Sequence, residues 1–247
     1  MAGRLILITG ASSGIGRATA ERLGAQGDTL LLLARNEARL AEVATAIAAK
    51  GGRATVFPVD LSDPAAVDEV TERIRTVHGT PDIVVNNAGA GRWLPVVETA
   101  IAEARAMMEL PYLAAFQVTR AFLPDMTARG SGLVAFVTSP ASWIVWPNAA
   151  AYVAARHALK GFAEALRSEV RGTGVGVSLI TLGTVSSSYW DHNPGSRDHL
   201  PKTPEWLLPE LSPDEAAATI VAALDQRRAH AVRPWFLRVL FAFGLNA

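Results

Sequence analysis

The chain has 247 residues, a formal net charge of zero and no cysteine. This length is enough for one large α/β domain with a substantial buried core, and the balanced charge gives no reason to expect a nucleic-acid partner. The lack of cysteine excludes disulfide bonds, thiolate metal sites and a thiol nucleophile, and we expect no bound metal.

Apolar runs alternate with alanine-rich, amphipathic stretches along the chain. The runs predict strands at 4–9, 29–34, 53–59, 82–86, 132–138 and 174–181. The stretches between them predict helices at 15–26, 36–50, 63–78, 98–128 and 149–172. Such alternation, with no linker, predicts a single α/β domain over 1–247, a doubly wound Rossmann-type parallel sheet flanked by helices. Because the first strand begins at Arg4, a signal peptide has no room and we expect a cytoplasmic protein.

The first apolar run leads directly into a glycine-rich turn at residues 9–16. A strand, such a turn and a following helix N-terminus are the parts that hold a dinucleotide pyrophosphate. Gly10 permits the tight turn, Gly14 lets the backbone approach the phosphates, and Gly16 lets the helix pack on the strand. We therefore expect a dinucleotide to contact Gly10, Ser12, Ser13, Gly14, Ile15 and Gly16.

The second predicted strand ends in Ala34-Arg35, where folds that bind NAD place a carboxylate for the adenosine ribose. The guanidinium of Arg35 suits a 2′-phosphate, which it can bind with full charge and two parallel hydrogen bonds. The alternative is that Arg35 is a solvated residue ahead of the next helix. We favour NADP(H) over NAD(H) as the cofactor.

Four motifs follow one another along the chain. After the glycine-rich turn come Val59-Asp60-Leu61, then Asn86-Asn87-Ala88-Gly89, and then Ser139 with Tyr152. In this order and spacing the sequence resembles the short-chain dehydrogenase/reductase family over nearly the whole chain. The resemblance implies a homodimer or homotetramer. It also implies a cofactor cleft bordered by Asp60, Leu61, Asn87, Ala88, Gly89, Tyr152, Gly183 and Val185.

The resemblance assigns the chemistry to Ser139 and Tyr152. In the family a tyrosine hydroxyl exchanges a proton with the substrate oxygen as hydride is transferred, and a serine hydroxyl holds that oxygen. A lysine one helical turn after the tyrosine lowers the pKa of the tyrosine and holds the nicotinamide ribose. In this chain Arg156 takes the lysine position, so the positive charge is kept while the donor geometry changes. Arg156 is therefore expected as a modified member of the catalytic group.

A second departure from the family lies in the predicted helix at 98–128. Pro111 stands where the family has an asparagine that marks a kink and holds a water molecule of a proton relay. Proline bends a helix and has no N–H to donate, so we expect the kink to remain without the side chain. With Arg156 in place of the lysine, the family's relay has lost both of its middle members.

Residues 184–211 are polar and proline-rich with little periodicity, which predicts a loop that acts as a substrate lid. Five aromatic residues stand beside the cleft motifs or at the start of this lid segment. They predict a cleft for a bulky hydrophobic molecule, the alternative being that they are core or subunit contacts. The five are Trp93, Trp143, Trp146, Tyr189 and Trp190.

The last part of the chain begins with a predicted helix at about 212–227, where Ser212 is a suitable N-cap and Pro213 fits the first helical position. The segment 230–247 that follows is strongly apolar but too short to span a membrane. Three interpretations compete for it: a subunit interface, which ranks first, a cover for the substrate cleft, and peripheral contact with a membrane surface.

Together these features predict an NADP(H)-dependent oxidoreductase, a ketone reductase or alcohol dehydrogenase. We expect it to act on a bulky hydrophobic carbonyl or alcohol through Ser139, Tyr152 and Arg156. Two alternatives stay open. One is a cyclase, dehydratase or isomerase on the same scaffold, with Tyr152 and Ser139 in acid–base roles and no net redox change. The other is a catalytically weak binding subunit.

Overall fold

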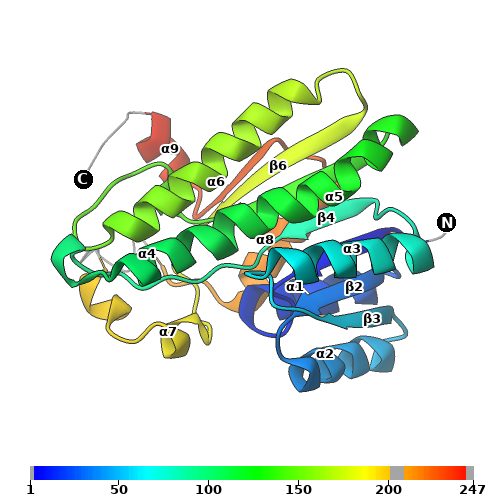
Figure 1. Cartoon of the computed structure of the whole chain (residues 1–247), viewed down its shortest axis with the longest axis horizontal. Helices are drawn as coiled ribbons and strands as arrows, with labels where there is room; N and C mark the ends of the chain where they lie inside the picture. Colours follow the sequence, from blue (N-terminus) through cyan, green and yellow to red (C-terminus); the bar gives the residue numbers. More distant parts are fainter. Residues whose placement is uncertain (1–2, 201–208, 243–247) are drawn as a thin grey trace.

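Parallel strands form one sheet at the centre of the molecule (Figure 1). The structure is a computed structural model that describes residues 3–200 and 209–242. Its strands are β1 (Leu5–Thr9), β2 (Thr29–Ala34), β3 (Arg53–Pro58), β4 (Ile83–Asn86), β5 (Gly132–Thr138), β6 (Val175–Leu182) and β7 (His230–Arg233). In the described part of the chain the strand order is β3-β2-β1-β4-β5-β6-β7, and all neighbouring pairs are parallel. This order confirms the predicted doubly wound, single-domain fold.

Helices cover both faces of this sheet (Figure 1). They are α1 (Gly14–Ala25), α2 (Glu37–Ala49), α3 (Pro64–His78), α4 (Ile101–Met108), α5 (Ala114–Arg129), α6 (Ala150–Glu169), α7 (Tyr189–His192), α8 (Pro213–Asp225) and α9 (Leu237–Ala242). In β1, Ile6 and Ile8 pack with α1, α2 and α8, while Leu7 packs with α3, α5 and α6. Both faces of the strand are thus buried, which explains its continuous apolar run. Among the described residues, no helix has the length and apolar character needed to cross a membrane.

The strand β7 is a feature that the sequence pattern does not predict. The segment 230–247 is expected only as an apolar segment, yet its first four residues pair with the end of β6, from Leu179↔His230 to Leu182↔Arg233. A run this short gives no clear periodicity, and its strand conformation comes from the pairing itself. Residues 243–247 of the same segment lie outside the described residues.

The helix expected at 98–128 is divided by a π-helical turn at Glu109–Leu113, between α4 and α5. Pro111 lies buried in this turn. Because proline has no N–H and its ring clashes with the preceding turn, the helix accommodates it by widening one turn. The N–H of Ala114 accordingly donates to the carbonyl of Glu109, five residues back. The expected interruption of the helix is therefore present.

The two ends of the lid segment, residues 184–211, are hydrogen-bonded to one another. The N–H of Leu211 donates to the carbonyl of Thr184 at 2.8 Å, and the N–H of Ser186 donates to the carbonyl of Leu211 at 2.9 Å. The short helix α7 lies between these two ends, while residues 201–208 lie outside the described residues. The lid segment is thus anchored beside the carboxyl end of β6.

The helix expected at about 212–227 is α8. Its first turn carries a capping box: the hydroxyl of Ser212 accepts from the N–H of Glu215 at 3.2 Å, and the Glu215 carboxylate accepts from the N–H of Ser212 at 2.9 Å. Pro213 occupies the first helical position, where no donor is needed. The helix packs against α1 and so flanks the glycine-rich turn.

Candidate active site

The glycine-rich turn joins β1 to α1 at the carboxyl end of the sheet. Gly10 has a φ of +66°, which residues with side chains rarely adopt, and a Cβ atom at Gly16 would lie 2.2 Å from the carbonyl oxygen of Gly10. Only glycine therefore fits at position 16. Ser13, the N-cap of α1, makes no side-chain cap hydrogen bond, unlike the N-caps of α2, α3 and α8. The first N–H groups of α1 thus suit a phosphate.

Thr9 and Asn87 tie the carboxyl ends of β1 and β4 together. The Thr9 hydroxyl accepts from the N–H groups of Asn87 and Ala88, both at 3.0 Å. Nδ2 of Asn87 in turn donates to the carbonyl of Thr9 at 3.1 Å. This turn fixes one wall of the central cavity, to whose lining Asn87 and Gly89 belong.

Tyr152 and Ser139 meet in the same cavity. Tyr152 lies in the first turn of α6, and Ser139 directly follows β5. The Tyr152 hydroxyl donates to Oγ of Ser139 at 3.2 Å, and this oxygen also accepts from the N–H of Ala141 at 3.2 Å. Both residues line the cavity. Two neighbouring hydroxyl groups at this position can contact one substrate oxygen together.

Arg156 is buried one helical turn after Tyr152, with only 7% of its surface exposed. Its guanidinium carbon lies 4.9 Å from the centroid of the Tyr152 ring, and a Cβ atom at Gly89 would lie 2.8 Å from its Nη2. The guanidinium is therefore held between this ring and the backbone of Gly89. Its Nε has no hydrogen-bond partner in the part of the chain that the structure describes. A ligand with oxygen acceptors would satisfy this buried cation.

Four of the five aromatic residues expected at the substrate end line one cavity of about 490 Å³. Trp93 lies between Tyr152 and Trp146, with ring centroids 5.3 Å apart in both pairs. Tyr189 and Trp190 come from α7 and pack edge to face, with centroids 5.2 Å apart. Burial and the nearby Tyr152 raise the pKa of Tyr189, and the charge of Arg156 offsets only part of this effect. Tyr189 is therefore neutral at ordinary pH, and the lid segment also brings the Arg197–Glu210 ion pair to the lining of the cavity.

Trp143, the fifth aromatic residue, lies outside this cavity. Its ring stacks on Phe241 with centroids 5.0 Å apart, and Nζ of Lys160 lies 4.4 Å from the same ring. Its Nε1 donates to the hydroxyl of Thr181 on β6 at 3.1 Å. The expected cleft position of Trp143 is thus corrected: its ring packs between β6, α6 and α9, while Trp146 faces the cavity.

The described part of the segment 230–247 covers one end of the cleft. Leu237 in α9 is buried and lines the cavity. Sequence reasoning missed this residue because one leucine within an apolar segment carries no positional signal. The cleft-cover interpretation of this segment is supported by Leu237, and the other two interpretations stay predictions.

Arg35 and Asp60 lie just beyond the carboxyl ends of the neighbouring strands β2 and β3, and both are exposed. Hydrogen bonds from the hydroxyl and the N–H of Ser62, together with the charge of Arg35, lower the pKa of Asp60. Leu61, next in the chain, is buried. In doubly wound folds the adenosine half of a dinucleotide lies beside these strand ends.

The lid segment also borders the glycine-rich turn. A Cβ atom at Gly14 would lie 3.2 Å from the Cβ atom of Ser187. The other cofactor residues expected in this region that line the cavity are Ile15, Gly183 and Val185. One continuous depression therefore extends from the turn to Tyr152 and the aromatic residues.

Comparison with known proteins gives a consistent match. A family model described as short chain dehydrogenase matches residues 4–195. The fatty acyl-CoA reductase of Acinetobacter baylyi is 31% identical in an alignment of 259 positions, which covers 99% of this chain and 85% of that protein. The resemblance expected from four motifs thus extends over almost the whole chain.

Solved structures share the architecture. The alcohol dehydrogenase from Thermococcus sibiricus complexed with 5-hydroxy-NADP has a TM-score of 0.79 and 28% identity, with 90% of each chain covered. A short chain dehydrogenase/reductase from Burkholderia phymatum in complex with NAD has a TM-score of 0.85 and 24% identity, covering 96% of this chain and 92% of that chain. This second likeness shows the fold alone. Both nicotinamide dinucleotides therefore occur among proteins of this architecture.

Proposed function

Because this chain belongs to the short-chain dehydrogenase/reductase family of oxidoreductases, we propose that it is an NADP(H)-dependent ketone reductase or alcohol dehydrogenase for a bulky hydrophobic substrate. The observation that carries this proposal is the hydrogen bond between the hydroxyls of Tyr152 and Ser139, in a cavity that Arg156 also lines. The apolar substrate agrees with the tryptophan-rich lining and with the name of the A. baylyi relative, a fatty acyl-CoA reductase.

The residues present fit a nicotinamide dinucleotide. The pyrophosphate suits the N-terminus of α1, where the side chain of Ser13 makes no cap hydrogen bond. It also suits the adjoining glycine-rich backbone, which is too crowded for a Cβ atom at Gly16. The unpaired Nε of Arg156 suits ribose hydroxyl oxygens, and Arg35 suits a 2′-phosphate. When bound, this cofactor supplies or accepts a hydride.

Tyr152, Ser139 and Arg156 each have a separate role in the proposed reaction. In the direction of reduction, the Tyr152 hydroxyl donates its proton to the carbonyl oxygen, and the Ser139 hydroxyl donates a hydrogen bond to the same oxygen. Arg156 stabilises the negative charge that develops on the tyrosine oxygen. Because arginine does not release its proton near neutral pH, it acts here as a fixed charge and not as a proton carrier. Oxidation of an alcohol runs the same steps backwards.

The reaction is tested by measuring cofactor consumption against product. Purified protein is given NADPH and a panel of aryl and alkyl ketones, and the alcohol formed is quantified together with the NADPH oxidised. One NADPH consumed per alcohol supports the proposal. A product formed without NADPH oxidation supports a cyclase, dehydratase or isomerase instead. If neither NADPH nor NADH binds, a redox function is excluded.

The preference for NADPH is predicted to depend on Arg35. Arg35→Ala is expected to weaken NADPH binding roughly 10–100-fold and to leave NADH binding nearly unchanged, because the lost interaction is with the 2′-phosphate alone. Binding is measured by energy transfer from tryptophan to the reduced nicotinamide. Arg39→Ala removes another exposed arginine nearby in α2 and serves as the control. Equal losses in the two variants would contradict the assignment.

We further propose that the chain forms a homo-oligomer through α5 and α6. At the start of α5, Leu113 and Phe116 are 40% and 42% exposed, and Phe116 packs on Phe162 of α6 with ring centroids 5.2 Å apart. An exposed aromatic group of this kind is typical of protein interfaces. Phe116→Glu is expected to reduce the mass measured by light scattering to that of a monomer. Arg39→Glu, an exposed position of α2 on the opposite face of the sheet, should leave the mass unchanged, and equal masses for both variants would refute this interface.

A further inference from the structure

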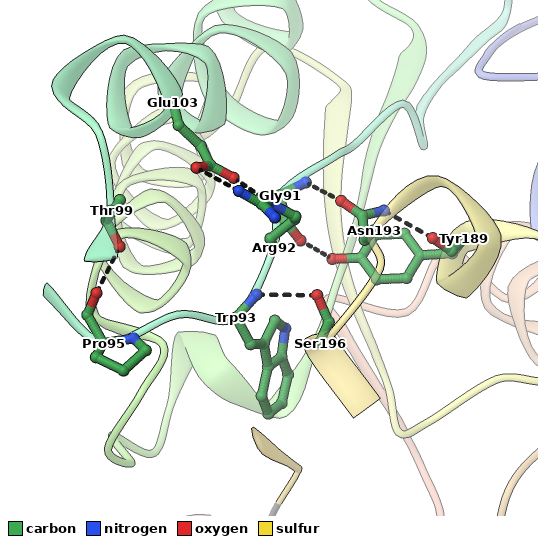
Figure 2. Close-up of polar contacts among 9 residues, drawn as sticks. All are labelled: Gly91, Arg92, Trp93, Pro95, Thr99, Glu103, Tyr189, Asn193 and Ser196. Atoms are coloured by element: carbon green, nitrogen blue, oxygen red, sulfur yellow. Dashed lines mark hydrogen bonds and ion pairs between the residues drawn. The ribbon is translucent and has the colours of Figure 1, made fainter. Parts of the chain in front are cut away.

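The segment Gly91–Trp93, which follows β4, is held by three side chains of the lid segment (Figure 2). The Tyr189 hydroxyl donates to the carbonyl of Gly91. Oδ1 of Asn193 accepts from the N–H of Gly91 at 3.2 Å. Oγ of Ser196 accepts from the N–H of Trp93 at 3.0 Å. We refer to Tyr189, Asn193 and Ser196 as the clasp.

Two members of the clasp are buried polar residues. Asn193 is 6% exposed and Ser196 is 0% exposed. Polar side chains of surface loops are normally solvated, and buried ones require hydrogen-bond partners. Here both side chains accept a hydrogen bond from a backbone N–H of the segment Gly91–Trp93. Nδ2 of Asn193 also donates to the carbonyl of Tyr189 at 2.7 Å. Neither is among the described residues that line the cavity, so both act through the segment that they hold.

The opposite side of this segment is fixed to α4 (Figure 2). Nε and Nη2 of Arg92 donate to the two carboxylate oxygens of Glu103 at 2.6 and 3.0 Å, which makes a bidentate ion pair. The hydrogen bonds from Arg92 lower the pKa of Glu103, so the pair stays charged at neutral pH. Residue 92 is therefore anchored to a helix, while residues 91 and 93 are anchored to the lid segment.

The segment forms part of the surroundings of Tyr152. A Cβ atom at Gly91 would lie 3.2 Å from Cδ2 of Tyr152, and the Trp93 ring centroid lies 5.3 Å from that of Tyr152. Trp93 packs on Trp146 at the same centroid distance. The aromatic surface of the substrate end is thus built on a backbone that the clasp holds.

We propose that Asn193 and Ser196 are specificity-determining residues, a role that rests on the proposed carbonyl–alcohol reaction: they hold Trp93 against Tyr152 and so set the width of the substrate end of the cleft. With the clasp in place, Trp93 and Trp146 present a fixed surface on which a flat ring system can pack. Without it, the segment keeps the Arg92–Glu103 ion pair with α4 and the ring contacts of Trp93 but loses the described hydrogen bonds that fix its backbone. A large flat substrate then loses its advantage in kcat/KM over a small one.

The Trp93–Trp146 pair provides a readout that does not require activity. Two indole rings with centroids 5.3 Å apart give a coupled circular dichroism signal, which Trp146→Phe identifies by removing it. We expect Ser196→Ala and Asn193→Ala to abolish or strongly reduce this signal. The control is Ser178→Ala, because Ser178 is equally buried but donates to the carbonyl of Arg228 at 2.7 Å. An unchanged signal in both clasp variants overturns the proposal.

The specificity itself is measured with NADPH and two ketones, a naphthyl methyl ketone and butanone. We expect Ser196→Ala and Asn193→Ala to lower the ratio of kcat/KM for the naphthyl ketone over butanone roughly tenfold, mainly through KM. The dissociation constant of NADPH and the ratio in Ser178→Ala should stay at the wild-type values. An unchanged ratio in the clasp variants overturns the specificity role. If the wild-type protein reduces no ketone, the proposed function fails, and the dichroism signal alone decides whether the clasp holds Trp93.

Discussion

Replacing Tyr152 by phenylalanine is expected to lower kcat for ketone reduction roughly 10²–10⁴-fold and to leave the dissociation constant of NADPH nearly unchanged. The ring stays in place because its contacts with Trp93 and with the Arg156 guanidinium do not involve the hydroxyl. The variant loses the proton donor and its hydrogen bond to Ser139. Initial rates at saturating NADPH measure the first effect, and tryptophan-to-nicotinamide energy transfer measures the second.

A second tyrosine provides the control for this prediction. Tyr112 lies in the π-helical turn, outside the residues that line the cavity, so Tyr112→Phe removes one hydroxyl with no expected effect on kcat. If Tyr152→Phe kept its rate, the proton would come from another group and the assignment of Tyr152 would be wrong. If Tyr152→Phe also lost NADPH binding, the hydroxyl would serve the cofactor and the rate loss would not isolate proton transfer.

Much of the fold follows from local sequence patterns. The six predicted strands are all present. Five of them are buried apolar runs, while β3, at the edge of the sheet, is only partly buried. An interruption at Pro111 is predicted from proline chemistry, but its form as a π-helical turn is not, because Pro124 lies within α5 without such a turn. By contrast, β7 depends on its pairing with β6, which no local pattern of four residues can reveal.

The site shows the same division between local and tertiary causes. Ser139 and Tyr152 could be predicted as a pair because their motifs are tied to the ends of β5 and the start of α6. Trp143 and Trp146 look alike in the sequence, yet packing against Phe241 takes only the first away from the cavity. Asn193 and Ser196 gave no signal, because a polar residue in a polar loop looks the same whether it is solvated or buried.

Arg156, which the family resemblance sets at a lysine position, packs closely against Gly89. The Arg156 guanidinium occupies space beside the bare backbone of Gly89, where a Cβ atom would lie 2.8 Å from Nη2. Pro111, which the resemblance sets at an asparagine position, lies in the interruption between α4 and α5 and has no side-chain amide that could hold a water molecule. In the proposed mechanism Arg156 does not release its proton, so no proton relay through this turn is required.

Removing the charge of Arg156 is therefore expected to cost much more than changing its shape. Arg156→Met is expected to lower kcat roughly 10²-fold, since a buried opposite charge against the Tyr152 ring, acting at an effective dielectric constant of ~20, contributes on the order of 3 kcal/mol. Arg156→Lys keeps the charge and is expected to preserve or raise kcat. Both rates are measured at saturating NADPH, with the dissociation constant of NADPH determined in parallel.

Lys160→Met is the control, because it tests whether the loss of any positive charge on α6 lowers kcat. Lys160 lies one turn beyond Arg156 and pairs with Glu164 at 3.1 Å, so Lys160→Met is expected to leave kcat within about twofold of wild type. Equal losses in Arg156→Met and Arg156→Lys would mean that the guanidinium geometry is required, and the role of a fixed charge would be wrong. A wild-type rate in Arg156→Met would show that Tyr152 transfers its proton without this cation, and the site would then rest on the two hydroxyls alone.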